Sequence, residues 1–211
     1  MELNYIIQRE KDRYIYSRGD KRIEVPFELK IMEYPILSTD ESITDFFGIV
    51  LDPPVYVNED GEIKIYVKLP LDTGIFATNG SSYKLIDKID VYPKKFALYG
   101  NIGEGVIYRY WKTSAYMEEF KPGRNEAITL IDIINKAESI GSISKVIFNS
   151  KALSLYSFDD SVCGEVIRVT RLQKGLAITK PINKPSIDGA KYIPTSPPKS
   201  IGGEFEMRFG T

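Results

Sequence analysis

The residues that could do chemistry in this chain are few, because its 211 residues include no histidine and a single cysteine, Cys163. A structural zinc site needs about four cysteine or histidine ligands, and Ser-His-Asp or Cys-His catalytic groups need an imidazole base. Acid–base chemistry would fall to Asp, Glu, Lys or Tyr side chains. We therefore expect a protein without a metal, a cofactor or catalytic residues, and a lone thiol that is small buried filler.

One aromatic segment has residues that suit ligand binding. Positions 108–112 read Tyr-Arg-Tyr-Trp-Lys, and alternation on a strand would place Tyr108, Tyr110 and Lys112 on one face. An exposed face of this kind could stack on sugar rings or single-stranded bases. Burial of the same rings in the core is the favoured alternative, since a domain of this size needs its large aromatic side chains inside. The candidate ligand-binding residues are Tyr108, Tyr110, Trp111, Lys112, Lys94 and Lys95.

A carboxylate-based hydrolase is a further alternative. Two carboxyl groups at a suitable separation can cleave a glycosidic bond without histidine. Asp52, Asp159 and Asp160 are candidates of the right type, although a sequence does not give the distance between them. We expect the protein not to be an enzyme.

Strand-forming patterns must position all of these residues. The clearest pattern alternates Ile63, Ile65, Val67 and Leu69 with polar side chains, directly after a turn sequence at 58–61. Residues 14–25 indicate a hairpin around Gly19, and residues 128–134 favour a strand over a helix because of their β-branched density. About a dozen short strands at regular spacing predict an all-β protein, an antiparallel β-sandwich that is possibly two packed β units.

The composition changes near residue 174, where prolines and glycines become frequent. We predict a β-sandwich-like globular domain over residues 1–173 and an extended Pro/Gly-rich and Lys-rich C-terminal tail over residues 174–211. Phe205, Met207 and Phe209 alternate with charged residues. This alternation predicts a possible terminal strand at 204–209, which would complete a sheet edge in this or another chain.

The net charge and the hydropathy pattern limit the classes of partner and the cellular location that we expect. The formal net charge is −1, so no nucleic-acid partner is expected. No apolar run approaches the roughly 20 residues of a membrane span, and a cytoplasmic location is the simplest expectation. High Ile content with few Gln and Cys resembles a thermophile. The leading hypothesis is a non-enzymatic module that binds a protein partner or forms a homo-oligomer.

Several segments also carry a resemblance to a known family. The run 93–100, the run 105–111, and the segments 145–149 and 153–156 resemble an uncharacterised archaeal protein family, a domain of unknown function, over roughly residues 50–170. The resemblance implies an archaeal source, a β-rich single domain and no assigned activity. It implies no catalytic residue.

Overall fold

The protein is built from strands throughout the part of the chain that the structure describes. The structure is a computed structural model that describes residues 5–195 and 203–208. Within these ranges lie seventeen strands and a single 3-10 turn, η1 (Ser150–Ala152). Most strand pairs are antiparallel, and the exceptions are β5 with β10 and β11 with β14. The predicted all-β class is confirmed, and the disputed segment at 128–134 lies within a strand, β11 (Glu126–Asn135).

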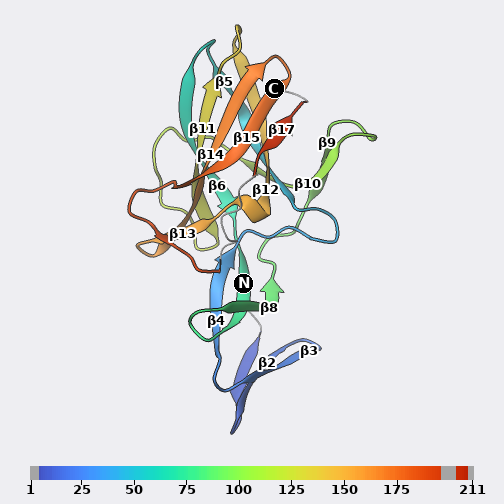
Figure 1. Cartoon of the computed structure of the whole chain (residues 1–211), viewed down its shortest axis with the longest axis vertical. Helices are drawn as coiled ribbons and strands as arrows, with labels where there is room; N and C mark the ends of the chain where they lie inside the picture. The colour runs from blue at the N-terminus through green and yellow to red at the C-terminus, as the bar shows by residue number, and fades with distance from the viewer. Residues whose placement is uncertain (1–4, 196–202, 209–211) are drawn as a thin grey trace.

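Two larger sheets form the upper body of the molecule in Figure 1. A four-stranded sheet has the order β12-β5-β10-β9. A seven-stranded sheet has the order β16-β13-β14-β11-β6, with β15 paired to β14 and β17 paired to β15. The strands of the first sheet are β5 (Phe46–Val57), β9 (Phe96–Tyr99), β10 (Val106–Thr113) and β12 (Gly141–Asn149). Those of the second are β6 (Glu62–Pro70), β11, β13 (Leu155–Phe158), β14 (Ser161–Gln173), β15 (Leu176–Pro185), β16 (Lys191–Tyr192) and β17 (Phe205–Met207).

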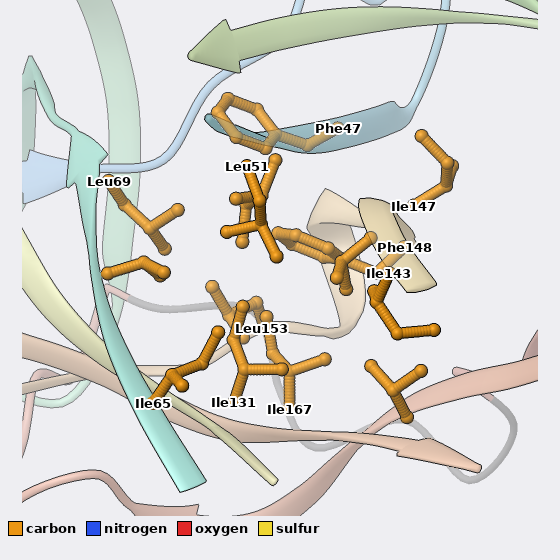
Figure 2. Close-up of a cluster of buried hydrophobic side chains, with 14 of the residues drawn as sticks. Phe47, Leu51, Ile65, Leu69, Ile131, Ile143, Ile147, Phe148, Leu153 and Ile167 are labelled. Carbon is orange, nitrogen blue, oxygen red and sulfur yellow. The ribbon is translucent and has the colours of Figure 1, made fainter. Parts of the chain in front are cut away.

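One hydrophobic core draws its side chains from both of these sheets. In Figure 2, Phe47 from β5 faces a layer that includes Ile131 from β11 and Ile167 from β14. The alternation that the sequence shows at 63–69 supplies the β6 side of this core, where Ile65 and Leu69 are fully buried. The alternation of apolar and polar residues therefore predicts β6 correctly, because this strand has one face toward solvent and one face against the core.

Two three-stranded sheets form the lower part of Figure 1. One has the order β1-β2-β3 and the other β4-β7-β8. Their strands are β1 (Ile6–Arg9), β2 (Arg13–Arg18), β3 (Lys21–Pro26), β4 (Lys30–Ile36), β7 (Asp72–Thr78) and β8 (Tyr83–Ile89). The predicted hairpin is the β2–β3 pair, with Gly19 at φ 55° in its turn. A separate small core around Tyr16, Ile75 and Ile89 joins the two sheets.

A buried carboxylate links these small sheets. Asp87 on β8 accepts hydrogen bonds from Tyr16 Oη at 2.6 Å, Arg18 Nε at 2.6 Å and Lys21 Nζ at 2.5 Å. Burial alone would raise the pKa of Asp87, but the hydrogen bonds from Arg18, Lys21 and Tyr16 outweigh it and hold that pKa well below its ordinary value. Burial, together with the adjacent carboxylate, raises the pKa of Tyr16 to about 12.

This cluster predicts a loss of stability in acid. Because the pKa of Asp87 is lower in the folded than in the unfolded chain, its stabilising contribution is complete above the ordinary pKa of about 3.9 and is lost as the pH falls toward the folded value. The free energy of unfolding, measured by urea titration, should decrease from about pH 5 to pH 2, and less steeply in Asp87→Asn. Asp20→Asn, at an exposed position of the β2–β3 turn, is the control. Equal slopes in Asp87→Asn and the parent would contradict the assignment.

The region predicted as a tail begins inside the seven-stranded sheet. Gly175, at φ 79°, turns the chain between β14 and β15, and β15 pairs with β14 from Leu176 to Pro185. The prolines at 181 and 185 are compatible with this strand because β17 covers only Ala177–Thr179 on its other side, so the remainder of β15 lies at a sheet edge. The extended segment expected from residue 174 is therefore corrected to a strand over residues 176–185. The domain division at residue 173 stays a prediction.

The predicted terminal strand is present in a shorter form. It corresponds to β17, Phe205–Met207, which pairs with β15 of the same chain. The Phe205 ring lies 5.0 Å from the Phe46 ring, measured between centroids, and Met207 is fully buried. Of the predicted range 204–209, residue 209 lies outside the described residues.

Candidate functional site

The chain passes three times between the small β4-β7-β8 sheet and the body. It crosses from β4 to β5, from β6 to β7 through Leu71, and from β8 to β9. A polar cluster at these crossings takes one residue from each, Ser38, Asp72 and Val91, and adds Arg109 from β10. We call these four residues the joint.

The joint is centred on a buried ion pair. Arg109 Nη1 lies 2.8 Å from Asp72 Oδ2, and the two side chains are 2% and 0% exposed. The Ser38 hydroxyl donates to Asp72 Oδ2 at 2.6 Å, and the Val91 N–H donates to Asp72 Oδ1 at 3.0 Å. Arg109 Nη1 also donates to the Ser38 carbonyl. Each crossing therefore contributes to the surroundings of one carboxylate, and both oxygens of Asp72 accept the hydrogen bonds that a buried charge requires. Among the described residues, Arg109 Nη2 has no hydrogen-bond partner.

Two cavities flank the joint. The first, of about 320 Å³, lies between the β4–β7 region and the segment at 124–125, and Asp72 contributes to its lining. The second, of about 220 Å³, lies between the segment that follows β4, the β7–β8 pair and the turn η1, and Ser38 contributes to its lining. Pro35, near the end of β4, lines both. The seam between the small sheets and the body is therefore a concave region of the described structure, and ligand sites are commonly found in such regions.

The first cavity has both polar and apolar side chains in its lining. It is lined by Glu33, Tyr34, Thr73, Arg124 and Asn125 among others. The Tyr5 hydroxyl donates to Glu33, and Leu71 N–H donates to the Asn125 carbonyl. Burial is the main cause that raises the pKa of Tyr34. The hydrogen bond between Leu71 and Asn125 thus joins two segments that line this cavity.

The second cavity is lined by both apolar and polar side chains. The apolar lining includes Leu37, Phe76 and Leu153, and Phe76 and Leu153 are buried. The polar lining includes two lysines, Lys88 and Lys151. This combination of apolar lining residues and a few polar groups is typical of small-molecule sites.

The predicted aromatic platform is divided between the core and the surface. Tyr108 is 2% exposed and belongs to the main core, and burial raises the pKa of its phenol. Tyr110 and Trp111 are partly buried and pack on the same core, and the Trp111 ring lies 5.1 Å from that of Tyr92. The buried alternative for Tyr108 is therefore the correct one, and this ring offers no stacking surface.

The predicted lysines and carboxylates lie apart from the cavities. Lys112 pairs with Asp52 at 2.5 Å and Lys94 pairs with Asp90 at 2.5 Å, while Lys95 is exposed. Asp159 and Asp160 are exposed at the β13–β14 turn. None of these residues contributes to the lining described for either seam cavity. Cys163 is fully buried, and burial raises the pKa of its thiol.

The sequence patterns do not predict the joint. Arg109 enters them only as a member of the aromatic run, and Asp72 follows the apolar Leu71 at the first position of β7. The available signal was a carboxylate inside the buried stretch 69–78, because a charge in an apolar run requires a partner.

Comparison with known proteins adds a family. Residues 3–208 match a family described as "Protein of unknown function (DUF432)". The chain belongs to this family. The match extends beyond the predicted range of 50–170 to include both small sheets and β17, so the joint and its two cavities lie inside the DUF432 region. No curated protein and no solved structure matches the chain.

Over 5–195 and 203–208, no helix is long and apolar enough to cross a membrane. In the same ranges, no group of three or more Cys, Asp and Glu side chains is arranged to hold a metal ion.

Proposed function

We propose that this DUF432 protein is a non-enzymatic module that self-associates through the β9–β10 hairpin. The observation that carries the proposal is an apolar surface on this hairpin. Leu98 on β9 and Ile107 on β10 are directly opposite, and they are 43% and 46% exposed. Ile102, in the turn between the strands, is 96% exposed. Neighbouring apolar side chains of this kind differ from scattered surface residues and are typical of contact sites.

The hairpin extends past the sheet that holds it. β10 pairs with β5 through Arg109–Thr113, whereas its β9 partner covers Val106–Arg109. The outer half of the hairpin is thus a two-stranded ribbon, which projects to the right of the body in Figure 1. Its inner face is anchored, since Tyr99 is buried and its ring lies 6.1 Å from that of Phe205. A two-stranded ribbon alone is marginal in stability, so a partner on the outer face would stabilise it.

A second copy of the chain is the partner that this edge suits best. β9 ends the order of the four-stranded sheet, and among the described strands none pairs with its outer side. An edge strand that pairs antiparallel with its own copy is self-complementary and gives a two-fold dimer, the commonest oligomer. In the register that centres on Leu98, the Leu98 side chains of both copies share one face.

In this proposal, the two larger sheets form the scaffold that carries the hairpin. We infer that they form a β-sandwich, because one core receives side chains from both of them.

The aromatic-platform and hydrolase alternatives have less support. Tyr108 is buried, Lys94 and Lys112 are engaged in ion pairs, and the candidate aspartates do not converge on a described cavity.

Self-association can be tested by native mass spectrometry with sedimentation equilibrium. The parent protein should be a dimer, and Ile107→Asp and Ile102→Asp should each weaken dimerisation at least tenfold, because a carboxylate at an apolar contact must be desolvated. Ile140→Asp, at a 65% exposed position outside the hairpin, should leave the dimer intact. A monomeric parent, or equal effects of the three substitutions, would overturn the proposal. Recovery of a different protein with the parent, lost in Ile107→Asp, would reassign the hairpin to a heteromeric contact.

A further inference from the structure

The 220 Å³ cavity beside the joint is lined by both apolar and polar side chains. Leu37, from the segment after β4, and Phe76, from β7, line it together with Leu153, which follows η1. Lys88 on β8 and Thr195 contribute polar groups to the same cavity. Parts of the chain that are distant in sequence therefore build one site.

Two of the polar groups lack a close partner among residues 5–195 and 203–208. Within these ranges the buried Thr195 Oγ1 atom has no hydrogen-bond partner. Lys88 Nζ lies 3.8 Å from the nearest Glu41 carboxylate oxygen and 3.5 Å from the Thr39 carbonyl. Both distances exceed those of a good charge-assisted hydrogen bond, about 2.7–2.9 Å.

Lys151, the second lysine of the cavity, has a close ion-pair partner. Lys151 Nζ lies 2.8 Å from Asp45 Oδ1, and a hydrogen bond from this pair raises the pKa of Lys151. Its charge is thus already matched. Lys88 is the ammonium that remains available to a ligand: its ion pair with the 63% exposed Glu41 is loose, and its charge also acts on the carboxylate of Asp40.

We propose that this cavity binds a small amphipathic carboxylate. Its alkyl chain would lie along the wall formed by Leu37, Phe76 and Leu153, and its carboxylate would accept hydrogen bonds from Lys88 Nζ and Thr195 Oγ1. A buried hydroxyl without a partner is costly and is satisfied by an acceptor at this position. The ligand carboxylate replaces the loose contact between Lys88 and Glu41, which moves toward solvent. This binding is independent of the hairpin, so either proposal can fail alone.

The chain length of the ligand provides the first test. Isothermal titration calorimetry with butanoate, hexanoate and octanoate should show affinity that rises about fourfold for each methylene until the apolar wall is filled. Octan-1-ol, which has the same chain but no charge, should bind at least tenfold more weakly than octanoate. Equal affinities for octanoate and octan-1-ol, or the absence of binding by octanoate, would overturn the proposal.

The second test uses substitutions that are expected to change the affinity for octanoate in opposite directions. Lys88→Gln should weaken octanoate binding about tenfold, whereas Glu41→Gln should strengthen it by removing a competing and repelling carboxylate. Thr195→Val should also weaken binding. Lys84→Gln, at an exposed position on the same strand β8 that is not part of the cavity lining, is the matched control. If Lys88 had a merely structural role, Lys88→Gln would lower the melting temperature, and Glu41→Gln would not strengthen octanoate binding. Equal affinities of Lys88→Gln and Lys84→Gln for octanoate would refute the site.

Discussion

Replacing Arg109 with methionine is expected to lower the free energy of unfolding by about 3–5 kcal/mol. Arg109 is 1% exposed, and its loss leaves the carboxylate of Asp72 buried without its counter-charge. The remaining donors to Asp72 are the Ser38 hydroxyl and the Val91 N–H, and two neutral donors do not replace a cation. Urea unfolding, followed by tryptophan fluorescence of Trp111, measures the change.

The same strand supplies a matched control. Lys112 also forms an ion pair, with Asp52, but the two side chains are 63% and 56% exposed. Lys112→Met should therefore change the free energy of unfolding by no more than about 1 kcal/mol. Similar losses from Arg109→Met and Lys112→Met would show that burial of the joint does not matter in solution.

A double substitution separates the ion pair from the space that it fills. In Arg109→Met with Asp72→Leu, no buried charge lacks a partner, so the double variant should be more stable than Arg109→Met alone. Full recovery is not expected, because Ser38 and Val91 lose their acceptor. A double variant less stable than the single one would mean that the hydrogen bonds to Asp72 outweigh the buried charge.

Local patterns in the sequence predict several of the strands. Alternation at 63–69 and the β-branched run at 128–134 correspond to β6 and β11, which pair with each other over Glu62–Pro70. Such patterns are local because one wet face and one core face repeat every two residues. The prolines after residue 174 gave a misleading local signal, since a sheet edge tolerates the missing N–H groups of β15.

The joint and the cavities depend on contacts that no local pattern contains. Asp72 and Arg109 are 37 residues apart in sequence, and the polar lining of the second cavity includes both Lys88 and Thr195. The aromatic run shows the same limit in a different way. Alternation places Tyr108 and Arg109 on opposite faces of a strand, but both residues are buried. Tyr108 belongs to the main core. Arg109 pairs with Asp72, and its guanidinium lies 5.8 Å from the ring centroid of the core residue Phe47.

Replacing Tyr108 with alanine is the second large effect that we expect, a loss of about 3–5 kcal/mol in the free energy of unfolding. The ring lies against Gly48 of β5 so closely that a Cβ atom on Gly48 would be 2.2 Å from Tyr108 Cδ2. Removing the ring therefore opens a cavity between β10 and β5, which the rigid sheet cannot close. Tyr56→Ala, at a 67% exposed position on β5, should cost much less and serves as the control.

The glycine provides the complementary test of this packing. Gly48→Ala in the parent should destabilise the protein, by about 1–3 kcal/mol, because the added methyl group meets the Tyr108 ring and Ile147 Cδ1. In the Tyr108→Ala background the same methyl group enters the space that the ring has left, so its cost should shrink. The coupling energy from this double-mutant cycle of urea titrations measures the contact directly. If the two losses simply add, Tyr108 does not pack on Gly48, and an outward-facing ring that is available for stacking becomes the better description.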